Sequence, residues 1–294
     1  MQLLFLAGYS QVTVTNLLTE NRTNPMGVDA VKPRFSWQLF SDKRNVLQTA
    51  YEIRLMFGKD MYWASDKINS DQSVQVGYRG KALQSGEKYS WKVKVWDNKG
   101  KASAWSAPSE FQMALLNNSD WKAKWITPGY EEDSLRASPL FRKQFNSNKK
   151  IVRATAHVTS HGLYQAQING KKVDDAYLTP GWTSYNKRLQ YQTYDVTNLL
   201  KNGSNAIGVT LGSGWYRGII GFTNSVNVYG KDIALLFQLD IKYSDGSTES
   251  VVSDGSWKSS TGSIVYAEIY NGETCNAFII SPLLVYHPFA IYVT

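Results

Sequence analysis

The sequence predicts an all-β protein built from two antiparallel sandwiches, and three observations support this. Apolar and polar residues alternate with period two over Tyr51–Leu55 and Tyr89–Trp96, as in strands with one buried face. Turn signals follow such stretches, including Asp97–Gly100 and Asp245-Gly246. The 294 residues include Trp 10, Tyr 18 and Phe 11 but only Pro 8, and amphipathic helical stretches are few. Many short strands with polar turns fit this balance, and the length suffices for two domains.

The first sandwich is expected over residues 12–116. Pro33–Trp37 has the pattern of an early strand with a core tryptophan, and Leu83–Trp91 leads into the long alternating strand. Trp105–Pro108 then precedes a final strand that ends at Met113. This order resembles a fibronectin type III module, so a fibronectin type III-like β-sandwich is predicted here.

The second unit is expected over residues 121–278, after a polar linker at 117–120. Asn169-Gly170 is a strong hairpin signal, and Asp195–Leu200 fits a single helical turn with Asp195 or Thr197 as its cap. These signals lie among strand-like segments, which favour a larger jelly-roll β-sandwich. The predicted strands are 151–158, 162–168, 205–211 and 233–243.

Both ends of the chain have unusual composition. The apolar run Leu3–Ala7 is far too short to span a membrane, and we expect either the remnant of a signal peptide or a buried strand. Residues 279–294 form an apolar tail without Lys, Arg, Asp or Glu. We expect a truncation or frame error there, with a genuine core strand pair as the alternative. A periplasmic or secreted location is the corresponding expectation.

Charge and cysteine content argue against several function classes. The net charge of +8 is spread over lysines that alternate with Asp and Gly, with no basic helix, so neither nucleic acid nor a membrane is an expected partner. The single cysteine, Cys275, cannot form an internal disulfide or a thiolate metal cluster. A nucleophilic role would require a partner among His157, His161 and His287, and we expect Cys275 to be structural or incidental.

His157 and His161 are four residues apart in a predicted strand. Such spacing places both side chains on one face of the sheet, roughly 13 Å apart. The two imidazoles cannot share one metal ion at that separation. We therefore expect them to be ordinary surface or core histidines.

A series of ordered motifs resembles bacterial α-L-rhamnosidases over about residues 12 to 277. In the first unit these are Val14–Asn21, Asn24–Asp29 and Pro33–Trp37. In the second unit they are Gly162–Tyr164, Ile168–Lys171, Leu178–Tyr185, Arg188, Tyr191–Thr197 and Leu211–Gly218.

The resemblance implies a string of β-domains followed by an (α/α)6 barrel that carries the catalytic carboxylates of an inverting glycoside hydrolase. No segment of this chain resembles that barrel, so no catalytic residue is assigned. The chain is expected to be the non-catalytic N-terminal portion, inactive alone, with the missing catalytic barrel and a rhamnose-containing glycan as partners. A stand-alone carbohydrate-binding module for rhamnose-containing glycans is the alternative.

Candidate binding residues lie in the stretch from Tyr177 to Gly218, which is crowded with aromatic and planar polar groups. Trp182 and Tyr185 follow a Pro-Gly turn, where they could stack on a sugar or dock another domain. Large aromatics beside tight turns commonly pack inward, so we favour Trp182 as a core residue. Asn169 is a further candidate ligand-binding residue at its hairpin turn.

Trp215, Tyr216 and Arg217 are the other candidates. Gly212, Gly214 and Gly218 bracket them and allow unusual backbone angles and close approach. We expect Trp215 to be partly exposed, contacting a ligand or the missing barrel, with a core position as the alternative.

No metal site is assigned, although some rhamnosidases that this chain resembles bind rhamnose through calcium. Calcium needs six or more oxygen ligands. The turn Asn169-Gly170, the loop Gly212–Gly214 and the pair Asp174-Asp175 are the plausible sources of such oxygens. Ser213 is a weaker ligand than Asn or Asp, which argues against calcium.

Overall fold

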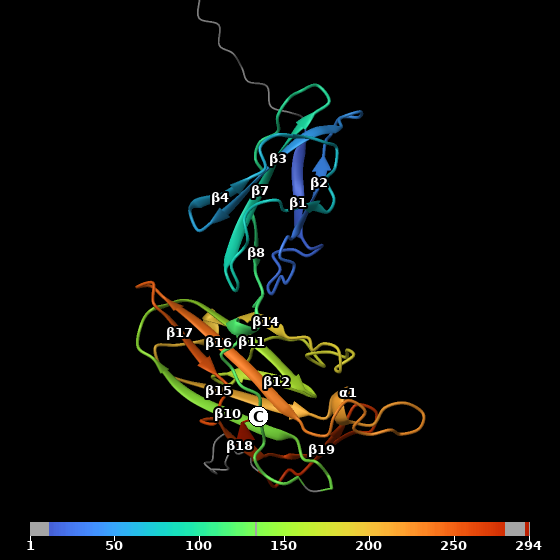
Figure 1. Ribbon diagram of the computed structural model, residues 1–294, viewed down its shortest axis with the longest axis vertical. Helices are drawn as coiled ribbons and strands as arrows, with labels where there is room; N and C mark the ends of the chain where they lie inside the picture. Colours follow the sequence, from blue (N-terminus) through green and yellow to red (C-terminus); the bar gives the residue numbers. More distant parts are fainter. Residues whose placement is uncertain (1–11, 133, 280–291, 294) are drawn as a thin grey trace, which may run out of the picture. The chain divides into compact units, whose positions relative to one another are not determined.

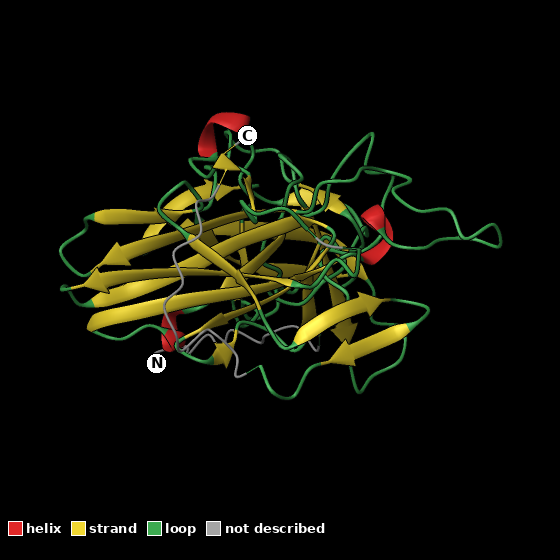
Figure 2. Ribbon diagram, turned by 90° about the horizontal axis from the view of Figure 1, so that it is seen from below, coloured by secondary structure: helices red, strands yellow, loops and turns green. Residues whose placement is uncertain are grey.

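The computed structural model describes residues 12–132, 134–279 and 292–293. The chain divides into two compact units, Met1–Asp120 and Trp121–Thr294. Figure 2 shows that strands make up nearly all of the regular structure and that helices are single short turns. The all-β fold class is therefore confirmed. The predictions for residues 1–8, for His287 and for most of the tail lie outside the described residues.

Two antiparallel sheets form the first unit (Figure 1). One has the strand order β1-β2-β6, and the other has the order β4-β3-β7-β8, with β5 paired to β3. The strands are β1 Thr13–Thr19, β2 Arg34–Phe40, β3 Gln48–Phe57, β4 Asp60–Ala64, β5 Ile68–Asn69, β6 Val76–Gly77, β7 Lys88–Asp97 and β8 Ser109–Gln112. Burial alternates residue by residue along β7, as the period-two pattern predicts.

Two tryptophans fill the core of the first unit, and each satisfies its indole N–H inside the protein. Trp91 donates to the Thr19 hydroxyl at 3.0 Å, and Trp37 donates to the Gln48 side-chain carbonyl at 3.0 Å. Phe35 packs on Trp91 with ring centroids 4.4 Å apart. Because each buried donor is paired, these large side chains are buried without the cost of an unsatisfied polar group.

The second unit contains two larger antiparallel sheets and a separate hairpin. The sheet orders are β13-β12-β15-β10-β18 and β14-β11-β16-β9-β21, with β17 paired to β16, and the hairpin is β19-β20. The strands are β9 Ile126–Thr127, β10 Pro139–Ser147, β11 Ile151–His161, β12 Leu163–Ile168, β13 Lys171–Lys172, β14 Gln192–Asp195, β15 Gly203–Gly212, β16 Ala234–Tyr243, β17 Thr248–Val252, β18 Lys258–Thr261, β19 Ile264–Glu268, β20 Gly272–Cys275 and β21 Tyr292–Val293.

Short turns connect these strands where the sequence predicts them. Asn169 and Gly170 both have positive φ, 52° and 77°, in the tight hairpin between β12 and β13. The 3-10 turns are η1 Asn118–Asp120 and η2 Thr197–Leu199, and the one α-helical turn among the described residues is α1 Gly214–Arg217. The Asp195 carboxylate accepts from the Thr197 amide at 3.0 Å. The N-cap residue of η2 is Val196, without a side-chain cap bond, so the expectation that Asp195 or Thr197 is the cap is wrong.

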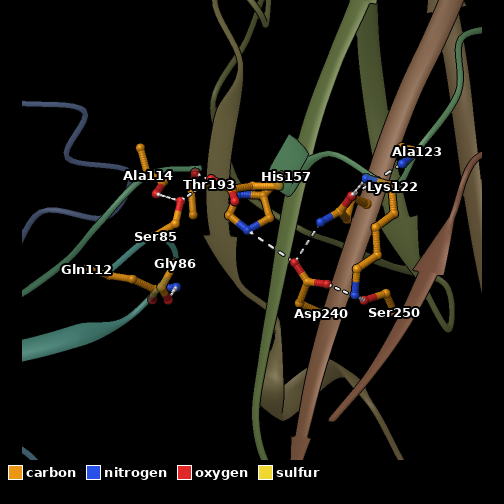
Figure 3. A network of polar contacts seen from close by, with 12 residues as sticks. Ser85, Gly86, Gln112, Ala114, Lys122, Ala123, His157, Thr193, Asp240 and Ser250 are labelled. Carbon is orange, nitrogen blue, oxygen red and sulfur yellow. Dashed lines mark hydrogen bonds and ion pairs between the residues drawn. The ribbon is translucent and has the colours of Figure 1, made fainter. Parts of the chain in front are cut away.

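The face of β11 and β16 that carries His157 holds a polar network (Figure 3). The His157 ring lies 3.7 Å from the Asp240 carboxylate and 3.2 Å from the Thr193 hydroxyl. The Asp240 carboxylate also accepts from the Ser250 hydroxyl at 2.6 Å and from the side-chain amide of Gln238 at 3.0 Å. Burial lowers the pKa of His157 to about 4, although Asp240 acts in the opposite direction. His157 is therefore a buried, neutral histidine at pH 7.

This histidine makes the second unit acid-sensitive. Its pKa is lower in the folded state than in the unfolded chain, so the unfolded state binds more protons between pH 6.5 and about 4. The stability that the neutral His157 contributes is fully present above pH 6.5. It is lost as the pH falls toward 4, which lowers the free energy of unfolding by about 2–3 kcal/mol. Denaturant unfolding of the second unit at pH 7 and pH 4.5 measures it. His157→Gln is the control and should lose less stability over this interval; an identical pH dependence would contradict the assignment.

Candidate functional site

One helical turn at the end of β15 positions the predicted residues Trp215, Tyr216 and Arg217. Gly214 begins α1 with a φ of 54°, and a Cβ there would lie 2.6 Å from the Leu163 Cγ atom. Only glycine fits both the backbone angle and this contact. The Gly218 amide closes the turn by donating to the Gly214 carbonyl at 3.0 Å. The glycines of this loop thus fix the turn, and they do not make it a flexible segment.

Seven aromatic rings gather around this turn and form what we call the aromatic cluster. Four of them, Trp182, Tyr185, Trp215 and Tyr216, are predicted site residues, and the structure brings all four together. The sequence did not assign the other three to a site. The cluster consists of Trp125, His161, Trp182, Tyr185, Trp215, Tyr216 and Tyr229.

Three rings of the cluster form a column. His161 stacks on Trp125 with centroids 4.3 Å apart and planes at 22°, and on Tyr216 at 4.6 Å and 7°. Tyr185 then meets Tyr216 edge-on at 5.4 Å and Tyr229 at 4.9 Å. The column joins the end of β11 to α1 and to the segment that precedes β9.

The other part of the cluster is a tryptophan pair. Trp182 and Trp215 are parallel within 7°, with centroids 5.6 Å apart. The Trp182 indole N–H donates to the Tyr229 hydroxyl at 3.2 Å, which holds the ring in place. Trp182 is 51% exposed, so the expectation that it is a core residue is wrong. Trp215 is partly exposed. An open pair of parallel rings of this kind can contact an apolar face of a ligand.

Arg217 differs from its predicted companions, because its side chain is only 1% exposed. Its Nη1 atom donates to the Glu132 carboxylate at 2.6 Å, and its Nε atom donates to the Ser213 hydroxyl at 3.3 Å. The Arg217 carbonyl accepts from the Asn227 amide at 3.0 Å, which anchors the following loop. Arg217 therefore supports the site from within the protein.

Asn169 lies with a separate set of residues. Its side-chain amide donates to the Leu199 carbonyl and to the Asn205 side chain, both at 2.8 Å, and its Oδ1 atom accepts from the Ala206 amide at 3.0 Å. These bonds use both ends of the Asn169 amide to hold the hairpin turn against β15. The structure gives Asn169 a structural role and does not bring it to the aromatic cluster.

A pocket of about 460 Å³ adjoins the column of rings. Its aromatic and charged lining residues are Trp125, Tyr130, Glu132, His161, Tyr216 and Asp232. Burial lowers the pKa of His161, although the Asp232 carboxylate acts in the opposite direction, so the imidazole is neutral at pH 7. Its size and its few convergent polar groups are typical of a small-molecule site.

Sequence reasoning missed most of this pocket. It predicts an ordinary histidine at His161, and it does not single out Trp125, Glu132 or Asp232. These residues come from the segment before β10, the end of β11 and the start of β16, so no local motif connects them. The pairing of β11 with β16 would have indicated that His161 and Asp232 lie close together. His161 pairs with Ala234, and Ala234 follows Asp232 by two residues.

The described residues contain no group of three or more His, Cys, Asp or Glu side chains able to hold a metal ion. Within the same residues, no helix is long and apolar enough to cross a membrane. Cys275 is exposed, and the neighbouring Glu273 carboxylate raises the pKa of its thiol. An activated cysteine nucleophile has a lowered pKa instead.

Two family models match the chain. Residues 14–117 match the Rha78A-like, N-terminal immunoglobulin domain, and residues 149–279 match the Alpha-L-rhamnosidase N-terminal domain. Immunoglobulin and fibronectin type III domains share the two-sheet sandwich architecture. The sandwich is thus confirmed, whereas a specific fibronectin type III relationship stays a prediction.

Characterised proteins show the same similarity. An alpha-L-rhamnosidase of Formosa agariphila is 38% identical over 280 residues, which is 90% of this chain but 30% of that protein. The crystal structure of the Aspergillus terreus alpha-L-rhamnosidase matches with a TM-score of 0.88 and 34% identity, over 96% of this chain and 34% of that one. The Streptomyces avermitilis alpha-L-rhamnosidase, complexed with L-rhamnose, matches with a TM-score of 0.88 and 25% identity, over 96% and 45%.

The fold and the site define a tandem of β-sandwiches whose second member carries an aromatic, carboxylate-lined pocket. The matches then identify the family: the two units belong to the N-terminal domain families of alpha-L-rhamnosidases. The chain spans about 30% of the length of its curated relatives.

The structure predicts unequal stability effects for two residues of the site. Trp182→Ala removes an exposed ring and should cost less than about 1 kcal/mol, as surface changes usually do. Arg217→Ala leaves a partly buried Glu132 carboxylate without its cation and should cost about 2 kcal/mol or more. Thermal and denaturant unfolding of the two variants compares them directly. A larger loss for Trp182→Ala than for Arg217→Ala would contradict this description of the site.

Proposed function

We propose that this chain is the non-catalytic N-terminal portion of an α-L-rhamnosidase that acts on rhamnosyl glycans. Catalysis would then belong to the part of the relatives' length that the chain does not span. The observation that carries the proposal is that both units match N-terminal rhamnosidase domains over most of the described chain, yet cover only about 30% of the relatives. The similar Streptomyces avermitilis enzyme was crystallised in complex with L-rhamnose, which supports the choice of glycan.

The aromatic cluster provides a surface for this role. Trp182 is held with its ring open to solvent, although exposing a large aromatic ring is unfavourable in an isolated unit. Sugars present apolar C–H faces that pack on such rings, and the catalytic domain of a longer enzyme could cover the same rings. The cluster therefore supports both partners, the glycan and the barrel.

A stand-alone carbohydrate-binding module is the second candidate. The favouring observation is that the tryptophan pair and the pocket both belong to the second unit and need no residue from another domain. Calorimetric titration with L-rhamnose, with and without calcium, bears on this alternative. Heat from the isolated chain supports sugar binding, and absence of heat at millimolar sugar supports a docking scaffold. A heat that requires calcium would support a calcium site in the second unit.

The non-catalytic role predicts that the purified chain does not hydrolyse an aryl α-L-rhamnoside. Inverting hydrolysis needs a paired acid and base, and the pocket does contain two carboxylates, from Glu132 and Asp232. Release of the aryl alcohol measures turnover, and the matched controls are Glu132→Gln and Asp232→Asn. Turnover that persists through purification and disappears in either variant would show that this chain is itself an enzyme.

A further inference from the structure

The pocket beside the ring column contains polar groups that the protein does not use. Among the residues the structure describes, no group forms a hydrogen bond with the His161 ring nitrogens, with the Trp125 indole N–H or with the Asp232 carboxylate. All three residues line the same cavity of about 460 Å³. Polar groups that converge on one cavity without partners are what fixes the orientation of a bound small molecule.

The geometry of the column decides which part of each ring meets a ligand. Trp125, His161 and Tyr216 lie nearly parallel, at 22° and 7°, with centroids less than 5 Å apart. Both faces of His161 are therefore covered by its neighbours, and one face of each neighbour is covered by His161. A cage for a quaternary ammonium ion needs several ring faces directed at one point. This column cannot provide them, and along its side it offers ring edges that carry N–H groups and a nitrogen lone pair.

The charges of the pocket disfavour an anionic ligand. Glu132 already pairs with the Arg217 guanidinium at 2.6 Å, so Asp232 carries the unpaired charge among these groups. His161 is neutral and supplies one donor and one acceptor. The Arg217 Nη2 atom is buried and has no hydrogen-bond partner within the described chain. Arg217 is only 1% exposed and is not among the residues that line the pocket, so its role is to hold the Glu132 carboxylate in place.

We propose that this pocket binds one neutral sugar residue through hydrogen bonds from the edges of the ring column, without a metal ion. Asp232 accepts from a sugar hydroxyl, and the Trp125 N–H and His161 bond neighbouring hydroxyl groups. The Glu132 carboxylate, which Arg217 holds from behind, also lines the pocket and accepts from a further hydroxyl. The choice of a sugar rests on the proposed function, and the pocket is a site distinct from the Trp182–Trp215 pair.

The test is ligand binding by the 294-residue chain, measured by tryptophan fluorescence and by calorimetry. The probes are L-rhamnose, D-galactose, D-glucuronate and tetramethylammonium, each with a chelator present. At least one neutral sugar should bind, the uronate should bind more weakly because Asp232 repels it, and tetramethylammonium should not bind. Asp232→Asn and His161→Phe should weaken the sugar at least tenfold, because both keep the shape of the site and remove hydrogen bonds. Val152→Ala, at an exposed position at the opposite end of β11 from His161, is the control and should change the affinity less than twofold.

A second kind of variant covers the case in which the first two do not fold. A Cβ at Gly230 would lie 2.1 Å from the Tyr216 hydroxyl, so Gly230→Ala displaces the end ring of the column without removing any polar group. It should also weaken the sugar. Thermal unfolding of each variant verifies that it is folded.

Three outcomes would overturn the proposal that this pocket binds a sugar. They are no saturable sugar binding, tighter binding of tetramethylammonium than of any neutral sugar, or sugar binding that is lost in Trp182→Ala and retained in Asp232→Asn and His161→Phe. None of them contradicts the non-catalytic role, which the aryl rhamnoside assay on the same preparation tests separately. Sugar binding that is seen only when calcium replaces the chelator would overturn the metal-free part of the proposal.

Discussion

The stacking of His161 between Trp125 and Tyr216 is the interaction on which the site depends. His161 ends β11 in one sheet of the second unit, whereas Tyr216 lies on the helical turn that leaves β15 in the other sheet. The stack therefore links the two layers of the sandwich at one end. Imidazole is well suited to this position, because it is flat enough to stack and, when neutral, still offers a donor and an acceptor at its edge. An aliphatic residue there would pack but would leave the cavity without polar groups.

The loop after α1 depends on the same turn. The Asn227 and Tyr229 amides donate to the Arg217 and Tyr216 carbonyls, at 3.0 and 3.2 Å, and the Ile219 amide donates to the Glu268 carboxylate at 3.0 Å. These bonds hold Tyr229 where it can accept from Trp182. The exposed tryptophan pair thus belongs to the same hydrogen-bonded framework as the buried Arg217, even though only the former reaches solvent.

Much of the fold could be predicted from sequence because its signals are local. The alternation along Tyr89–Trp96, the Asn169-Gly170 turn and the helical turn after Asp195 each need only a few adjacent residues, and all three occur as expected. Whether a tryptophan beside a turn points inward depends on partners far along the chain, and for Trp182 the partners are Trp215 and Tyr229. The pocket could not be predicted for the same reason, since strand pairing and a single helical turn assemble it from segments far apart in the sequence.

The hydrogen bond between Trp91 and Thr19 has a consequence for how the chain acquires its structure. It joins residues 72 positions apart, and Val28 pairs with Met113 across a still longer interval. Loop closure over such distances is entropically costly before any contact repays it, so sandwiches of this kind fold slowly. During synthesis the first unit cannot complete its core until Met113 has left the ribosome. Strand β1 can pair with β2 early, but the Thr19 hydroxyl receives the Trp91 indole N–H only after most of that domain has been translated.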